Sequence, residues 1–173
     1  MNTRMLACFF VLMVGCISAL ACTFANQEDA VASVQDDELT TGPEDSEEVR
    51  KPGSIDEDAS KEFTRTASGL EYRILRKSDG KKPTATQTVE VDYKGWLDDG
   101  KIFDSSYRRD DTISFGLNQV IKGWTEGVQL VGEGGMIELN IPYELGYGAY
   151  GTPGGPIPAR ARLHFIVELK SIK

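Results

Sequence analysis

Residues 89–105 of this 173-residue chain predict most of its architecture, and they read VEVDYKGWLDDGKIFDS. Val89, Val91 and Tyr93 alternate with charged residues, which is the period-two pattern of a strand with one buried face. The following segment, residues 98–101, contains the glycine that a tight turn needs. We therefore expect an antiparallel hairpin whose two strands flank residues 98–101.

The same alternation of apolar and polar residues recurs at residues 70–75, 137–141 and 163–170. Each segment is expected to form a strand with one face in the core and the other in solvent. A second glycine-rich turn, at residues 132–135, lies between apolar runs and is expected to be another hairpin connection.

One short stretch departs from the period-two pattern. After Gly123, the apolar residues Trp124, Val128 and Val131 fall at helical spacing with polar residues between them. A short helix here would lie across the concave face of the sheet. We therefore predict an α+β fold in which about five antiparallel strands wrap around one short helix.

Composition divides the chain into three segments. Residues 1–25 carry Arg4 and then an apolar run that ends in small residues, which is the pattern of a signal peptide. Residues 26–62 contain thirteen acidic and three basic residues and no Trp or Tyr, so we expect an acidic disordered linker. Residues 63–173 contain fourteen acidic and fifteen basic residues and are expected to form one folded domain without a nucleic-acid surface.

All three cysteines, Cys8, Cys16 and Cys22, lie in or at the end of the predicted signal peptide, so we expect no disulfide in the folded domain. Residues 19–22 resemble a bacterial lipobox, with Cys16 as a weaker second candidate, and they also fit the small-x-small rule of ordinary cleavage. Three outcomes stay open: a membrane-tethered lipoprotein lipidated at Cys22, a soluble secreted protein, and an uncleaved chain. We expect a secreted or cell-envelope (periplasmic) location.

Aromatic residues recur on the strand-like segments between Val89 and Phe165, among them Tyr93, Phe103 and Trp124. No nucleophile with a neighbouring base and no cluster of metal ligands accompanies them in the sequence. We interpret the set as the wall of a pocket that acts by shape and by excluding water, and we expect neither a cofactor nor a metal.

Four sequence blocks follow one another along the chain: VDYKGWL at 91–97, GKIFDSSY at 100–107, VIKGWTEG at 120–127 and IPYELGYG at 141–148. Through these blocks the chain resembles the FKBP-type peptidyl-prolyl cis/trans isomerases, from about residue 67 to residue 173. Four blocks in family order and at near-family spacing make the resemblance specific. It implies that residues 63–173 are an FKBP-like isomerase domain with the α+β fold expected above.

The resemblance also implies roles for individual residues. Trp124 would form the floor beneath a substrate proline ring. Ile121 would offer its backbone N–H to a substrate carbonyl, and the Tyr147 hydroxyl would be a second donor. The predicted walls of the pocket are Tyr93, Phe103, Val120, Ile121 and Phe165.

At the pocket edge the resemblance places Asp104, aligned by Tyr93 and with Arg109 as its candidate partner. Two departures from the family pattern are local: Ile113 stands where many members carry an aromatic residue, and the loop at 149–158 is one residue longer than in some members. These departures leave substrate preference and affinity for macrolide ligands open.

The implied activity is acceleration of X–Pro bond rotation in exported proteins. Rotation about a peptide bond has a barrier of about 18–20 kcal/mol because the planar form is stabilised by resonance. A dry aromatic pocket favours the less dipolar twisted amide over the planar form that water solvates. The alternatives are a non-catalytic proline-peptide-binding module or holdase chaperone with the same pocket, and an unrelated small β-rich envelope scaffold. The expected partners are proline-containing polypeptides, and the protein is expected to be a monomer.

Several other polar residues are interpreted as structural. Asp98, Asp99, Asp110 and Asp111 are adjacent carboxylates of the kind that turns contain, and we prefer this interpretation to a metal site. His164 is the only histidine in the chain, so it cannot form a triad or a metal site alone. We expect it to be a partly exposed residue without a catalytic role.

Overall fold

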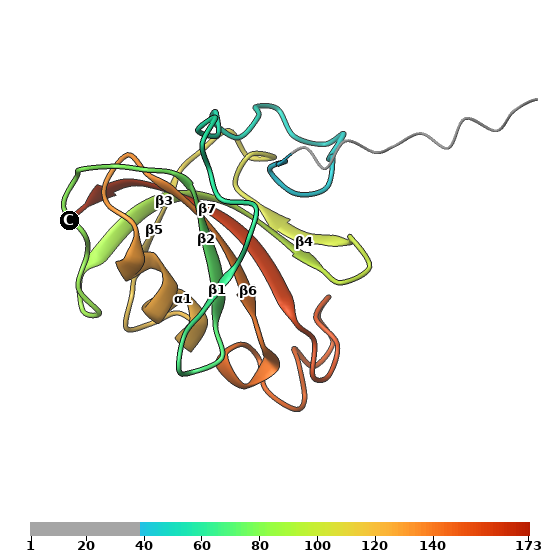
Figure 1. Cartoon of the computed structure of the whole chain (residues 1–173). Helices are drawn as coiled ribbons and strands as arrows, with labels where there is room; N and C mark the ends of the chain where they lie inside the picture. The colour runs from blue at the N-terminus through green and yellow to red at the C-terminus, as the bar shows by residue number, and fades with distance from the viewer. Residues whose placement is uncertain (1–38) are drawn as a thin grey trace, which may run out of the picture. The chain divides into compact units, whose positions relative to one another are not determined.

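The computed structural model describes residues 39–173, and the fold is that of these residues alone. Their seven strands form one antiparallel sheet in the order β1-β2-β6-β7-β3-β4, and β5 also pairs with β3. The sheet curves around helix α1 (Figure 1). The elements in chain order are β1 (Thr64–Arg65), β2 (Glu71–Arg76), β3 (Thr88–Leu97), β4 (Ile102–Ser105), β5 (Ile113–Gly116), α1 (Lys122–Gly127), the 3₁₀-helix η1 (Val128–Leu130), β6 (Met136–Ile141), the 3₁₀-helix η2 (Tyr143–Leu145) and β7 (Leu163–Ile172).

This architecture confirms the predicted α+β class, with seven strands in the described residues instead of about five. The additional strands are short, since β1 has two residues and β5 has four. Segments of this length contain too few alternations for a period-two pattern to be recognised. The predicted helix is present as α1, and the chain continues directly into η1, which contains Val128.

The predicted hairpin is formed by β3 and β4, in which Gly95 pairs with Asp104. On its other side β3 pairs with β7 along nine residues, and there Gly95 lies opposite Phe165. The second glycine-rich turn, residues 132–135, joins η1 to β6, so the prediction of a hairpin there is wrong. Glycine permits a tight turn after a helix as readily as after a strand, and the sequence of the turn does not distinguish the two.

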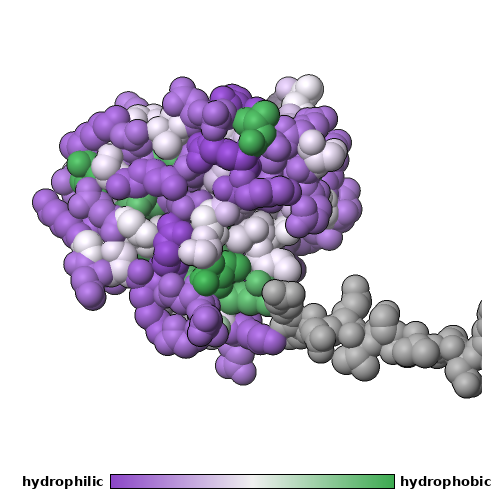
Figure 2. All heavy atoms as spheres, turned by 90° about the horizontal axis from the view of Figure 1, so that it is seen from above, coloured by the Kyte–Doolittle hydropathy of each residue, from purple (hydrophilic) through white to green (hydrophobic). Residues whose placement is uncertain are grey.

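Residues 39–62, which we expected to be disordered, lie against the face of the sheet opposite α1. We call this segment the N-terminal strap; Figure 1 shows it in cyan to blue-green along the top of the view. Seen from above, the molecule presents mainly hydrophilic residues with small, separate hydrophobic patches (Figure 2). Beneath this surface, Leu39 and Ile55 of the strap pack against a buried apolar cluster made of Leu75, Trp96, Tyr107, Met136 and Ile166.

Ion pairs explain why an acidic segment is ordered on this sheet. Arg50 of the strap pairs with Asp92 of β3, and Glu48 lies 3.1 Å from the ammonium nitrogen of Lys94. Asp92 and Lys94 are only 0% and 2% exposed, so β3 is buried on both faces from Val91 onward, and the expected solvent face is absent there. The disorder prediction used average composition, which does not reveal that these charges meet opposite charges of the sheet.

The folded unit therefore extends at least from residue 39, and the predicted domain start at residue 63 is too late. The predicted signal peptide, its cysteines and residues 26–38 of the predicted linker lie outside the described residues. Within residues 39–173, no helix has the length and apolar character needed to cross a membrane.

Candidate functional site

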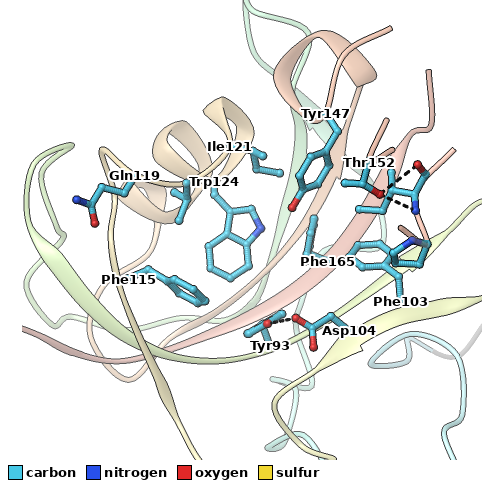
Figure 3. Close-up of a pocket in the computed structure, with 13 residues that line it drawn as sticks. Tyr93, Phe103, Asp104, Phe115, Gln119, Ile121, Trp124, Tyr147, Thr152 and Phe165 are labelled. Atoms are coloured by element: carbon cyan, nitrogen blue, oxygen red, sulfur yellow. Dashed lines mark hydrogen bonds between the residues drawn. The ribbon is translucent and has the colours of Figure 1, made fainter. Parts of the chain in front are cut away.

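A cavity of about 660 Å³ opens between α1, the curved sheet and the loop after η2. All eight residues that the sequence predicted for the site line this cavity, and Figure 3 shows their side chains converging on it. The structure therefore brings the whole predicted set together. The lining residues are Tyr93, Phe103, Asp104, Phe115, Gln119, Val120, Ile121, Trp124, Tyr147, Thr152, Pro156, Ile157 and Phe165.

Trp124 lies at the base of the cavity and is 4% exposed. Three aromatic rings meet it edge to face: Tyr93 at 5.3 Å between ring centroids, Phe115 at 5.6 Å and Phe165 at 5.3 Å. Edge-to-face contacts are the preferred geometry of aromatic pairs and fix the orientation of the indole. Phe103 extends the wall through its own edge-to-face contact with Phe165, at 5.4 Å.

The indole Nε1 of Trp124 is buried and has no hydrogen-bond partner within the described part of the chain. In Figure 3 this nitrogen lies on the side of the ring that faces Phe165. A buried hydrogen-bond donor without a partner is rare in folded proteins because it lowers stability, and such a donor often has a role in the function of a site. The base of the cavity is therefore apolar except for one unused N–H.

The carboxylate of Asp104 stands at the edge of the cavity, held from two sides. It accepts a hydrogen bond from the Tyr93 hydroxyl, and Arg109 Nη1 lies 2.7 Å from its other oxygen. Arg109 Nη2 also lies 3.3 Å from the Tyr93 hydroxyl, which closes a three-residue ring of contacts and confirms the expected Arg109–Asp104 pair. Burial, together with the hydrogen bond to Asp104, raises the pKa of Tyr93, so its hydroxyl stays protonated and acts as a donor.

Two hydrogen-bond donors at the cavity have no partner among residues 39–173. The backbone N–H of Ile121 precedes α1, and the Ile121 carbonyl accepts the first helical bonds from Trp124 and Thr125. The Tyr147 side chain reaches in from the loop after η2, and its hydroxyl points into the cavity (Figure 3). Burial, and secondarily the charge of Asp104, raises the pKa of Tyr147, which keeps this second hydroxyl protonated.

Comparison with known proteins identifies the architecture that carries this cavity. A family model described as FKBP-type peptidyl-prolyl cis-trans isomerase matches residues 79–170. The chain belongs to this family. Among curated relatives of this FKBP, FkpA from Escherichia coli K12 is 47% identical over 108 residues, which are 62% of this chain and 39% of the relative. FkpA from Aeromonas hydrophila is 44% identical over 141 residues, covering 79% of this chain and 52% of the relative.

Solved structures agree with the family assignment. The crystal structure of Escherichia coli FkpA matches with a TM-score of 0.61 and 44% identity, over 66% of this FKBP and 53% of that chain. The crystal structure of AtFKBP13 matches with a TM-score of 0.59 and 34% identity, over 65% of this FKBP and 99% of that chain. This FKBP spans about two fifths to one half of the FkpA relatives that it matches.

Sequence reasoning missed several lining residues of the FKBP cavity, and Phe115 is the most important of them. It belongs to the four-residue strand β5, and its ring also lies 6.0 Å from that of Tyr93. The sequence leaves Phe115 and Trp96 open as core or surface residues. Trp96 is buried on the opposite face of the sheet, where it stacks on His164 at 5.7 Å. The spacing between Ile113 and Phe115 fits a strand, but two apolar residues are too few to establish one. The other lining residues that were missed are Gln119, Thr152, Pro156 and Ile157.

The loop at 149–158 forms one rim of the FKBP cavity through Thr152, Pro156 and Ile157. Thr152 organises it: its hydroxyl accepts a hydrogen bond from the Ile157 N–H at 3.1 Å, and its N–H donates to the Ile157 carbonyl at 3.0 Å. Ile157 is 5% exposed and anchors the loop in the main core, whereas Tyr150 is 86% exposed. The rim is therefore fixed at its base and presents one aromatic ring to solvent.

The polar residues that we interpreted as structural lie away from the cavity lining. His164 Nε2 is 2.7 Å from an Asp98 oxygen, and its Nδ1 is 2.7 Å from the Asn140 side-chain oxygen. Asp110 contacts Arg50. Within residues 39–173 there is no group of three or more His, Cys, Asp or Glu side chains placed to hold a metal ion.

Proposed function

We propose that this protein is a peptidyl-prolyl cis/trans isomerase that acts on proline-containing polypeptides without covalent chemistry. The observation that carries the proposal is an aromatic cavity that contains Trp124 and also holds the Ile121 N–H and the Tyr147 hydroxyl, two donors without a partner among the described residues. Membership of the FKBP family supports the same conclusion. The geometry fits a reaction that needs a shaped, dry environment and a small number of directed hydrogen bonds.

The proposed mechanism follows from the X–Pro amide itself. As the amide twists, conjugation is lost and its carbonyl becomes less dipolar, so an apolar cavity stabilises the twisted state relative to the planar state in water. Each tenfold acceleration requires about 1.4 kcal/mol of such preference. A neutral hydrogen bond contributes about 0.5–1.5 kcal/mol, so the Ile121 and Tyr147 donors would add to the effect of desolvation.

An NMR exchange experiment on a short X–Pro peptide tests the proposal. We expect catalytic amounts of the wild-type protein to accelerate cis/trans exchange, and Asp104→Leu to accelerate it much less. Peptide binding without faster exchange would overturn the proposal and favour the non-catalytic binding module.

We further propose that the protein works in the cell envelope, tethered through a lipid on Cys22. The support is the sequence pattern alone, namely Arg4, the apolar run to Ala21 and the cysteine that follows. In a bacterial host, intact-mass measurement is expected to find a mature chain that begins at Cys22 with added acyl mass. An unmodified chain beginning at Cys22 or Asn26 would contradict the tether.

We also propose that the folded domain acts as a monomer and that macrolide ligands compete with substrate for the cavity. The apolar lining around Trp124 and Phe165 supports binding of such ligands. Sedimentation at micromolar concentration and inhibition of peptide exchange by a macrolide test the two points separately.

A further inference from the structure

The N-terminal strap contacts the segment that carries Arg109. This segment, residues 105–111, runs from the last residue of β4 into the connection to β5, and we call it the Arg109 turn. The N–H groups of Val49 and Arg50 both donate to the carbonyl oxygen of Tyr107, at 3.1 and 3.4 Å. Side-chain contacts between turn and strap accompany them, including Ser105 with Glu48 at 3.2 Å and Arg108 with Asp45 at 2.7 Å.

The side chain of Arg50 makes the central contact between the two segments. Its guanidinium binds both carboxylate oxygens of Asp92, with Nη1 at 2.6 Å from Oδ2, and its Nε lies 3.2 Å from an Asp110 oxygen. The same guanidinium lies over the ring of Tyr107, 5.2 Å from its centroid. Asp110 has a φ of +53°, a left-handed turn conformation that aspartate adopts more readily than most residues with a Cβ. Arg50 therefore contacts the end of the Arg109 turn at a left-handed residue.

A series of hydrogen bonds, buried at Asp92 and Ser106, connects Asp92 to Arg109 at the edge of the cavity. The Ser106 hydroxyl donates to Asp92 at 3.1 Å and accepts the backbone N–H of Tyr93 at 3.0 Å. The Ser106 carbonyl accepts the N–H of Arg109 at 3.0 Å. Asp92 and Ser106 are both 0% exposed, so water does not compete for these bonds.

The ion pair between Arg109 and Asp104, at the cavity end of these hydrogen bonds, is weak by itself. The Arg109 and Asp104 side chains are 44% and 41% exposed, and an exposed ion pair contributes only about 0–1 kcal/mol. The position of the Arg109 guanidinium therefore depends on the backbone of the Arg109 turn. That backbone is held from the other side by the strap.

We propose that the N-terminal strap positions the Tyr93–Asp104–Arg109 contacts at the cavity edge, with Arg50 as the positioning residue. The inference deepens the proposed isomerase function and rests on it. Arg50 is on the opposite face of the sheet from the cavity and does not line it. It acts through Asp92 and through the Arg109 turn.

The test compares strap variants in the full chain, at a temperature where thermal unfolding shows each one to be folded. Arg50→Gln is expected to lower kcat/KM about threefold to tenfold, as for coupled residues in one network, and Arg50→Lys is expected to lower it less. Asp56→Ala is the matched control. The Asp56 carboxylate accepts the Lys77 N–H at 2.7 Å and anchors the strap just beyond the end of β2, away from the Arg109 turn. Its loss is expected to reduce stability and leave kcat/KM unchanged.

Two further measurements separate positioning from general destabilisation. In an Asp104→Leu background, Arg50→Gln is expected to cause no additional loss of kcat/KM, because the group that it positions is absent. NMR signals of the Arg109 guanidinium protons are expected to shift in Arg50→Gln toward their positions in Asp104→Leu. Asp56→Ala is expected to leave them in place.

Wild-type kcat/KM in a folded Arg50→Gln variant, or an equal loss in the Asp104→Leu background, would overturn the inference. If Arg50→Gln does not fold, Arg50→Lys provides the same comparisons. An inactive wild type would overturn the proposed function instead. In that case the NMR signals of the Arg109 guanidinium still test the positioning role of Arg50. Unchanged signals in Arg50→Gln would refute this role, and shifted signals would support it.

Discussion

The backbone of Gly95 lies directly against the ring of Phe103. A Cβ atom at Gly95 would stand 2.6 Å from Phe103 Cζ and 2.6 Å from Phe165 Cε1, closer than real Cβ contacts come. Gly95 sits in β3 between its partners Asp104 and Phe165. The absence of a side chain at Gly95 therefore leaves room for the rings of Phe103 and Phe165 to pack against the backbone of β3.

Replacing Gly95 by alanine is therefore expected to push both rings into the cavity. We expect kcat/KM to fall at least tenfold and stability to fall by about 1–3 kcal/mol, the usual effect of overpacking. Gly100→Ala is the control. Its φ of +80° also disfavours a Cβ, but nothing lies within 4 Å, so stability is expected to fall by about 1–2 kcal/mol with kcat/KM unchanged. Equal kcat/KM in the two variants would refute the role of Gly95.

Trp124 offers a test of the cavity base. Trp124→Leu is expected to abolish most isomerase activity because the flat indole surface is lost. Its loss of stability is expected to be smaller than that of a Trp→Ala change, which is about 3–5 kcal/mol. Trp124→Phe removes the unpaired Nε1 donor and keeps an aromatic ring, so we expect it to retain more activity. A folded Leu variant with wild-type peptide exchange would show that Trp124 is only a core residue.

Tyr147→Phe isolates the contribution of one hydroxyl. The hydroxyl has no partner within residues 39–173, so stability is expected to be unchanged, while kcat/KM is expected to fall by a factor corresponding to about 1–2 kcal/mol. Tyr143→Phe is the matched control, since Tyr143 belongs to the preceding 3₁₀-helix η2 and lies outside the cavity lining. If both variants exchange peptide at the wild-type rate, the Tyr147 hydroxyl is not a substrate donor.

Glu168 makes stability depend on pH below 5. Burial opposes ionisation of Glu168, but bonds from Arg76, the Gly53 N–H, Tyr107 and Lys170 outweigh it and lower the pKa from 4.5 to about 2. A carboxyl whose pKa is lower in the folded state stabilises the protein above its unfolded-state pKa. This stabilisation, on the order of 3 kcal/mol, is lost as the pH falls from 5 toward 2. Urea titrations at several pH values are expected to show this slope, and Glu168→Gln is expected to flatten it. An unchanged slope in Glu168→Gln would contradict the assignment.

Truncation tests the strap as part of the folded unit. A chain that begins at residue 39 is expected to match the stability of the full chain. A chain that begins at residue 63 loses the strap's ion pairs with Asp92 and Lys94 and the apolar contacts of Leu39 and Ile55. Water can then solvate the two uncovered charges, so the expected loss of stability comes chiefly from apolar burial and is on the order of 2 kcal/mol. Denaturant titration of the two chains measures the difference. Equal midpoints would show that the strap contributes nothing to stability.

Much of the cavity could be predicted because most of its residues lie in the four sequence blocks through which the chain resembles the FKBP family, and the resemblance implied their roles. The positions of Tyr93 beside a hairpin and of Trp124 on a helix also follow from local spacing. The period of a strand or helix is set by backbone geometry, so it can be read from neighbouring residues. Phe115 was missed because its strand is four residues long and its position beside Trp124 depends on pairing with β3.

The α+β class, the central hairpin and the aromatic set follow from the amino-acid sequence alone, because each depends on residues close together in the chain. The tertiary structure alone revealed the place of the strap and its contact with the Arg109 turn. Arg50 and Asp92 are 42 positions apart, and nothing in the composition of an acidic segment indicates which of its charges will meet a partner. Whether a charged segment orders depends on the pairing and burial of particular charges in three dimensions, which local patterns do not encode.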